Sequence, residues 1–207
     1  FEKRIYKRSE HVVALSPGMQ EGVVKAGTPV EKTSMIPNMS KPDIFHPHEV
    51  NQDVVKRFNL DLNKFNVIHF GMLAVANGLE YIVNAAIELK KRGDKDINFI
   101  FMGEGAMEPE LKEIVKREGL TNVQFLGNHP VGVVAEVTNC CGASITSFKN
   151  LAILATNSPN KLFDSLLRIF CSTSLAFFRT FCHCCTTCFT SHHFFIHNRL
   201  LCGVFCS

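Results

Sequence analysis

The stretch NVIHFGMLAVANGLEYIVNAAIELKKRG, residues 66–93, decides the fold class of this sequence. It begins with a short apolar run over 67–70, reaches a glycine at position 71 and continues into a helical pattern that ends at Gly93. The apolar residues of that pattern recur every three or four positions, and they are Leu79, Ile82, Val83, Ala86 and Leu89. A strand, a glycine turn and an amphipathic helix in this order predict one half of a βαβ unit.

The same order of elements repeats after residue 93. Apolar runs over 97–102, 123–126 and 143–146 predict further strands, and helices are predicted before Gly119 and over 131–137. We therefore expect an α/β fold, with a Rossmann-like parallel sheet and flanking helices. Right-handed crossovers bring the carboxyl ends of such strands to one edge of the sheet, which is where ligands of open α/β sheets bind.

A shorter pattern lies near the amino end. A strand is predicted over 11–15, and a helix begins after the N-cap residue Ser16 and ends near Gly27. Another strand is predicted over 31–36. The segment 36–47 contains three prolines and no helical period, which predicts a linker or a crossover segment.

Charge and cysteine are distributed unevenly along the chain. Residues 1–167 carry 19 basic and 19 acidic side chains, and the net charge of +3 comes from Arg168, Arg179 and Arg199. The basic balance therefore does not indicate a nucleic-acid partner. Seven of the nine cysteines follow residue 167, so the preceding part is typical of a reducing compartment.

The chain shows no signal for export or membrane insertion. Its first residues lack the apolar run of a secretory signal, and no apolar run approaches the length of a membrane span. We expect a cytoplasmic protein. Because the sequence opens without an initiator methionine, we also expect that upstream sequence is missing.

Three of the predicted strands end at a glycine: Gly71, Gly103 and Gly127. One interpretation is that tight turns after strands need a positive φ, which glycine adopts easily. The other is that these turns present backbone N–H groups to a phosphate, with helix N-termini behind them. The sequence contains neither GxGxxG nor GxxxxGK[ST], so dinucleotide and P-loop sites of the usual kind are not supported.

Several motifs in order resemble glycosyltransferase family 4. They are HVVALSPGMQEGVVKAGTPVEKTSMIPNMSKPDIFHP (11–47), the stretch 66–93, INFIFMGEGAMEPELKEIVKREGLTNVQFLGNHP (97–130) and TNSPNKLFD (156–164). The variants ANGL and SPNKLFD resemble the branch that builds bacterial surface polysaccharides, including fucosamine-transferase-like enzymes. The resemblance implies the GT-B architecture, in which two Rossmann-like domains face each other across a cleft.

The resemblance also implies a domain division. Residues 1–48 would be the end of the acceptor domain and the interdomain linker, and 49–167 the first half of the donor-nucleotide domain. Residues 168–207, rich in Cys, Phe and His, do not follow the family pattern. We expect this tail to be out of frame or disordered; a zinc site within CHCCTTC and a membrane-surface segment are the alternatives.

The function implied is that of a retaining, metal-independent transferase that uses a UDP-sugar and no cofactor. Its acceptor would be lipid-linked or a polysaccharide, and the full-length enzyme would associate peripherally with the cytoplasmic face of the membrane. The catalytic groups would lie largely in the missing domain, so we expect this chain to be an inactive fragment. A non-catalytic nucleotide-binding module is the alternative.

The predicted donor site combines the strand-end turns with the stretch 156–164. A departing nucleotide diphosphate gains negative charge, which a cation at a helix N-terminus stabilises. Lys161 fits this role, although a solvated lysine in a first helical turn is the alternative. The predicted donor-binding residues are Gly71, Met72, Asn77, Gly103, Gly127, Asn160, Lys161 and Asp164.

Two positions depart from the family pattern. Asp164 matches the second acid of the E-x7-E motif, which implies a hydrogen bond to the nucleotide ribose, whereas Thr156 replaces the first acid. The turn 71–77 lacks the Arg or Lys that many relatives place there. The backbone amides of Gly71 and Met72, with Asn77 and Lys161, would then have to hold the diphosphate.

Overall fold

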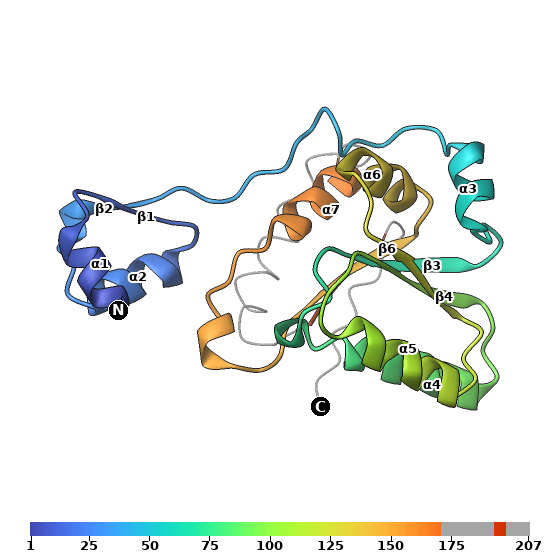
Figure 1. The fold of residues 1–207 in the computed structure, drawn as a ribbon. Helices are drawn as coiled ribbons and strands as arrows, with labels where there is room; N and C mark the ends of the chain where they lie inside the picture. Colours follow the sequence, from blue (N-terminus) through green and yellow to red (C-terminus); the bar gives the residue numbers. More distant parts are fainter. Residues whose placement is uncertain (171–192, 198–207) are drawn as a thin grey trace.

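A five-stranded sheet in the order β5–β4–β3–β6–β7 lies at the centre of the molecule (Figure 1). The computed structural model describes residues 1–170 and 193–197. Four strands are parallel, as predicted: β3 (Phe65–Phe70), β4 (Ile97–Met102), β5 (Val123–Gly127) and β6 (Ala143–Ser147). The strand order reverses between β3 and β6, so this pair forms the topological switch point of the sheet.

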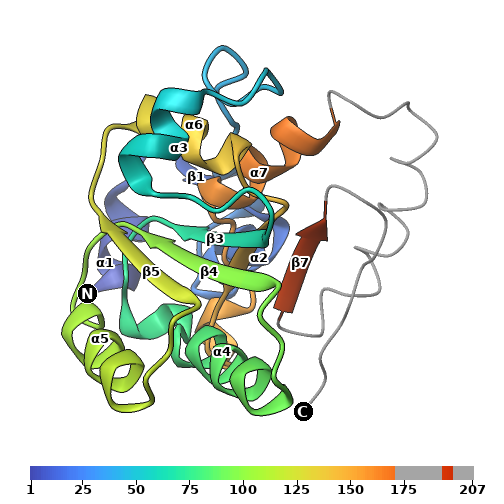
Figure 2. The ribbon, with the colours of Figure 1, turned by 90° about the vertical axis from the view of Figure 1, so that its right-hand side faces the viewer.

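Helices cover both faces of this sheet (Figures 1 and 2). On one face lie α4 (Glu80–Arg92) and α5 (Glu108–Arg117). On the other lie α3 (Gln52–Phe58), α6 (Val131–Asn139) and α7 (Asn160–Phe170). Helices α4 to α6 are predicted from the sequence, whereas α3 is not, because its seven residues are too few for a clear helical period.

Each face of the sheet has its own hydrophobic core. In β4, Phe99 and Phe101 pack toward α4 and α5, whereas Ile100 and Met102 pack against the opposite cluster. Because successive side chains of a strand point to opposite faces, a sheet covered on both sides needs nearly continuous apolar strands. This explains why the strand at 97–102 reads as an apolar run rather than as an alternation.

The N-terminal unit comprises α1 (Glu2–Arg8), β1 (Val12–Ala14), α2 (Pro17–Lys25) and β2 (Thr33–Met35), and β1 pairs with β2 in parallel. Both strands are shorter than predicted. In the second, the 3₁₀ turn η1 (Val30–Lys32) occupies the predicted start of the strand. The predicted cap is confirmed, since the Ser16 hydroxyl accepts a hydrogen bond from the Met19 amide at 3.2 Å. Helix α1 was not predicted.

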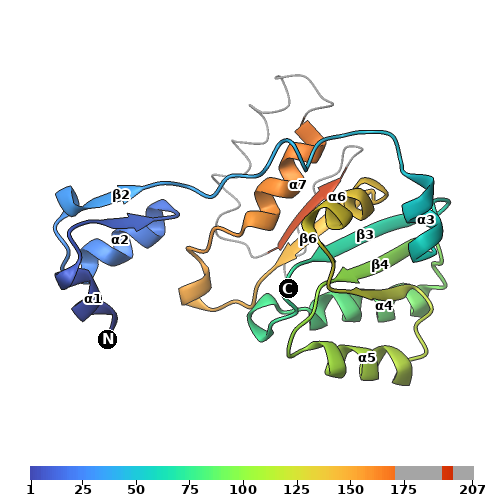
Figure 3. The same cartoon turned by 45° about the horizontal axis from the view of Figure 1, so that its top comes forward.

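A long extended segment, residues 36–51, connects β2 to α3 and passes α7 and α6 (Figure 3). It contains no helix or strand, as the linker prediction required. Two further 3₁₀ turns, η2 (Val75–Asn77) and η3 (Ala152–Leu154), lie in the loops after β3 and β6. The linker therefore brings residues from the amino end alongside the helices of the central sheet.

The tail has two described parts. Helix α7 continues through the predicted seam at residue 167 as far as Phe170, and β7 (His193–His197) pairs antiparallel with β6. The sequence showed no strand period at β7. The CHCCTTC segment lies outside the described residues, and with it the zinc and membrane-surface alternatives. No described helix is long and apolar enough to span a bilayer.

Candidate functional site

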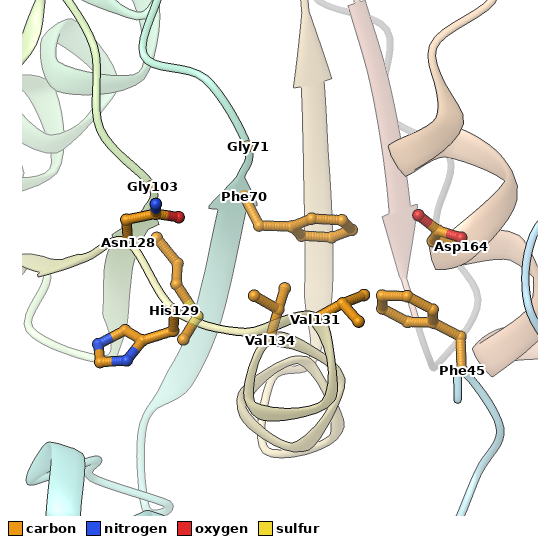
Figure 4. A pocket seen from close by; sticks show the side chains of 10 residues that line it. Phe45, Phe70, Gly71, Gly103, Asn128, His129, Val131, Val134 and Asp164 are labelled. Atoms are coloured by element: carbon orange, nitrogen blue, oxygen red, sulfur yellow. The ribbon is translucent and has the colours of Figure 1, made fainter. Parts of the chain in front are cut away.

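A pocket of about 210 Å³ lies at the carboxyl edge of the parallel strands (Figure 4). Its walls come from the ends of β3 and β4, the loop after β5, the start of α6, the second turn of α7 and the linker. The lining residues are Phe45, Phe70, Gly71, Met102, Gly103, Asn128, His129, Val131, Val134 and Asp164. Gly71, Gly103 and Asp164 of the predicted set thus meet in one cavity.

The turn after β4 packs so closely on the turn after β3 that only glycine fits at position 103. Gly103 has φ +146°, and a Cβ built there would lie 1.9 Å from the carbonyl oxygen of Gly71. Gly71 and Gly127 also adopt positive φ, at 109° and 76°. These values confirm the tight-turn interpretation of the three strand ends.

The backbone amides of two of these glycines are already used within the sheet, which corrects one predicted role. The Gly71 N–H donates to the Met102 carbonyl at 2.9 Å, and the Gly103 N–H donates to the Gly127 carbonyl at 2.8 Å. The reason is that the parallel ladder continues one residue beyond β3 and β4. Gly71 therefore shapes the pocket by having no side chain, and its amide is not available to a diphosphate.

Asn77 is also occupied within the protein. Its side-chain amide donates to the Met72 carbonyl at 2.6 Å, and its own carbonyl accepts from the Ser147 hydroxyl at 2.7 Å. These contacts stabilise the turn after β3 and use one donor of the side-chain amide within the protein. Met72 is 70% exposed and does not line the pocket.

Lys161 reaches from α7 over the turn that follows β3. Its Nζ lies 3.8 Å from the point where a Cβ on Gly71 would stand, at the switch point between β3 and β6. Burial lowers the pKa of Lys161 to about 8. Within the described residues, no carboxylate forms an ion pair with it. An ammonium group that is partly desolvated and lacks a counter-charge is suited to binding an anion.

Asp164 lies one turn further along α7 and faces the pocket (Figure 4). Its Oδ1 accepts a hydrogen bond from the Ser40 hydroxyl at 2.5 Å. Burial raises the pKa of Asp164, and this effect is opposed by the Ser40 hydrogen bond and by the charge of Lys41. Asn160, the first residue of α7, is exposed and does not line the pocket.

His69 is a residue of this region that the sequence analysis did not identify. It is fully buried in β3, and its Nδ1 lies 3.1 Å from the Ile145 carbonyl. Burial and the nearby charge of Lys161 lower the pKa of His69 to about 3, although the carbonyls of Ile145 and Met72 act in the opposite direction. The imidazole is therefore neutral at physiological pH. Its position inside an apolar strand offered no functional signal.

The N-terminal unit and the linker contact the turn that precedes α7. The Ser16 hydroxyl donates to the Thr156 carbonyl at 2.6 Å, and the Asn38 amide donates to the Ser158 carbonyl at 2.5 Å. A Cβ on Gly18 would lie 2.5 Å from the Thr156 methyl. Thr156, which stands where the family has its first acid, thus packs against the N-terminal unit and does not line the pocket.

His129 and the apolar walls complete the pocket. The His129 Nε2 bonds to the Leu126 carbonyl at 2.9 Å, and its ring packs edge-on against Phe58. It is thus engaged within the loop between β5 and α6. The rings of Phe45 and Phe70 stack with centroids 6.1 Å apart. Their contact across 25 residues of sequence could not be predicted from periodicity.

Comparison with known proteins identifies relatives among sugar-transferring enzymes. The chain is 34% identical over 102 residues to α-galactosylglucosyldiacylglycerol synthase of Streptococcus pneumoniae, and 35% identical over 65 residues to α-D-kanosaminyltransferase of Streptomyces kanamyceticus. The matches cover 47% and 31% of this chain but only 25% and 16% of those proteins. No family model matches the sequence.

Solved structures show the same architecture. Anabaena HepE in complex with UDP and glucose superposes with a TM-score of 0.63 at 20% identity, over 80% of this chain and 45% of HepE. WaaG, a glycosyltransferase of lipopolysaccharide biosynthesis, superposes with a TM-score of 0.58 at 13% identity, over 70% of this chain and 40% of WaaG. The fold is thus α/β and Rossmann-like, as in these GT-B neighbours. Together the relatives support a place for the chain in the glycosyltransferase superfamily.

Proposed function

We propose that the pocket binds the nucleotide-sugar donor, a UDP-sugar, of a retaining glycosyltransferase that builds cell-surface polysaccharide. The observation that carries this proposal is the position of Lys161 and Asp164. One helical turn brings an ammonium, without a carboxylate partner in the described part of the chain, over the Gly71 turn and a carboxylate into the adjoining pocket. The ammonium can bind the diphosphate of a nucleotide. The carboxylate, one turn away, can accept a hydrogen bond from the ribose of the same nucleotide.

The chemistry expected of Lys161 is the stabilisation of the leaving group. As the bond between the sugar and the diphosphate breaks, negative charge accumulates on the departing phosphate. A fixed ammonium in a partly desolvated site lowers the free energy of that charge more than a hydrated one does. The N-terminus of α7 adds the partial positive charge of its free amides.

The remaining walls suit the rest of the nucleotide. Phe45, Phe70, Val131 and Val134 form an apolar surface that can receive a planar base, and the Asp164 carboxylate can accept a hydrogen bond from a ribose hydroxyl. The HepE complexes contain UDP, UDP-glucose or UDP with glucose, which supports a uridine nucleotide as the ligand.

We further propose a lipid-linked or polysaccharide acceptor at the cytoplasmic face of the membrane. The name of the streptococcal relative contains a glycosylated diacylglycerol, and WaaG is described as an enzyme of lipopolysaccharide biosynthesis. Galactosylglucosyldiacylglycerol and lipopolysaccharide are both glycans attached to lipids. The chain spans less than half of each of these solved structures, so we expect the purified chain to bind donor with little or no turnover.

Calorimetry with UDP on the full chain tests the donor site. Replacing Lys161 by Ala should weaken UDP binding about 10- to 100-fold, because hydrogen bonds to charged groups contribute roughly 1.5–3 kcal/mol. Asp164→Ala should weaken it by a smaller factor. Lys116→Ala, which removes an exposed lysine from α5, is the matched control and should leave the affinity unchanged. Absence of UDP binding by the wild-type chain would contradict the proposal.

A further inference from the structure

The linker forms part of the donor pocket. Phe45 lines the cavity, and Ser40, five residues earlier, donates its hydroxyl hydrogen to Oδ1 of Asp164 at 2.5 Å. The two partners are 124 residues apart in the sequence. Among the described residues, nothing donates a hydrogen bond to the other oxygen, Oδ2. The carboxylate therefore has one oxygen held by the linker and one available to a ligand.

We propose that Ser40 is a positioning residue for the donor, because its hydroxyl holds Oδ1 of Asp164 so that Oδ2 faces the pocket and accepts a ribose hydroxyl. This inference rests on the proposed function. A carboxylate at the end of a free side chain samples several rotamers. Ligand binding selects one of them, and the lost conformational entropy reduces the affinity. A hydrogen bond from the linker fixes the carboxylate before the ligand arrives.

The same hydrogen bond acts on the charge of Asp164. Burial disfavours the ionised carboxylate and raises the pKa of Asp164, whereas the hydroxyl of Ser40 and the charge of Lys41 lower it. The other titratable groups near the pocket are Lys161, one turn earlier on α7, and His129 on the opposite wall. In an ionised carboxylate both oxygens act only as acceptors, so the Ser40 contact favours the form in which Oδ2 can accept the ribose hydroxyl.

The neighbouring linker contact provides a matched control. Asn38 donates to the Ser158 carbonyl at 2.5 Å and so holds the same segment of the linker against the same turn. It does not touch the Asp164 carboxylate. A change that merely loosens the linker should therefore appear with Asn38→Ala, whereas a change in the carboxylate itself should appear only with Ser40→Ala.

The experiment is a ¹³C NMR titration of the Asp164 carboxyl carbon in the full chain without nucleotide, followed by UDP calorimetry at pH 7. In Ser40→Ala we expect a higher pKa for Asp164 and about tenfold weaker UDP binding. Ser40→Thr, which keeps the hydroxyl, should restore both values. Asn38→Ala should leave the pKa of Asp164 at its wild-type value.

The two measurements separate the two proposals. If the wild-type chain binds UDP, and Ser40→Ala changes neither the pKa of Asp164 nor the affinity, the role of Ser40 is overturned while the proposed function stands. If the wild-type chain does not bind UDP, the proposed function is overturned, and the role of Ser40 toward a donor with it. The NMR titration needs no ligand, so it reports on the Ser40 contact in either case.

Discussion

The central sheet and the N-terminal unit are built from the same kinds of element, yet they are stabilised differently. In the central sheet, Ile68, Leu73 and Phe101 are completely buried between helices on two faces. In the N-terminal unit the buried apolar side chains are those of Ala14 and Val23, while apolar residues of both its strands are exposed. The central sheet thus holds a core of its own, and the N-terminal unit holds very little.

The N-terminal unit is held to the rest of the described chain by polar contacts, and the linker combines such contacts with the burial of Phe45 against Phe70. Ser16, Asn38 and Ser40 donate hydrogen bonds to Thr156, Ser158 and Asp164. A hydrogen bond contributes on the order of 1 kcal/mol to stability, whereas burying a large apolar side chain contributes about 1.5–3 kcal/mol. The difference teaches that the sheet provides stability, and that the N-terminal contacts mainly set the geometry of the turn beside the pocket.

The largest expected effect is on the central sheet, from Gly103→Ala. The new methyl would overlap the Gly71 carbonyl, a backbone atom that cannot move away, at a φ of +146° that alanine avoids. We expect a loss of about 4 kcal/mol in the free energy of unfolding, measured by urea denaturation. Gly132→Ala in α6, where nothing lies within 4 Å of the new methyl, should instead be neutral or stabilising. Equal stabilities for the two variants would contradict the described packing.

The second prediction concerns the pH dependence of UDP binding. Since burial lowers the pKa of Lys161 to about 8, its charge is present below pH 8 and is lost above it. An anion binds the charged form, so affinity should be flat from pH 7 to 7.5 and then fall by up to about tenfold per pH unit, since one proton is lost. Calorimetry across pH 7–9.5 measures this.

Lys161→Arg serves as the control for that profile. A guanidinium stays charged throughout this range, so the decline above pH 8 should disappear even if the affinity itself changes. A wild-type profile that remains flat to pH 9.5 would contradict this prediction.

The third prediction weakens the contact between the two regions. Ser16→Ala removes both the N-cap of α2 and the hydrogen bond to the Thr156 carbonyl. We expect a loss of about 1 kcal/mol, confined to the N-terminal unit. Hydrogen exchange should show weaker protection in α2 and unchanged protection in β3 and β4. Weaker protection in the central strands would mean that the two regions unfold as one cooperative unit.

The smallest effect is expected from Gly22→Ala, in the middle of α2. Nothing lies within 4 Å of the new methyl, and alanine favours a helix by up to about 1 kcal/mol over glycine. Hydrogen exchange should slow in α2, while the urea midpoint of the central sheet should not change. A rise of that midpoint would contradict the independence of the two cores.

Much of the fold could be predicted because its signals are local. The apolar strands and the glycine that follows β3, β4 or β5 lie within short windows, and so do the stripe of α4 and the cap at Ser16. The misses have physical reasons. Helix α3 has only about two turns and therefore no clear helical period. Strand β7 pairs with β6, which lies nearly fifty residues earlier in the chain. A strand whose partner is distant need carry no local pattern.

The candidate site was predictable in part. Glycine at 71 and 103, and the residues Lys161 and Asp164, were expected at the strand edge, and the structure brings them together there. Their role in binding a donor stays a prediction. The role given to the Gly71 amide was wrong, because whether an N–H is free depends on the neighbouring strand and not on the residue itself.

By itself, the sequence determined the order of strands and helices, the positions where only glycine permits the turn, and the presence of a cation and an acid one helical turn apart. Those features follow from local conformation and from the helical repeat. The tertiary structure alone decided which backbone amides form hydrogen bonds between strands, that Phe45 stacks on Phe70 in the pocket wall, and that Ser40 donates a hydrogen bond to Asp164. These depend on contacts between residues far apart in the chain: the pairing of the strands decides the amides, and the path of the linker decides the contacts of Phe45 and Ser40.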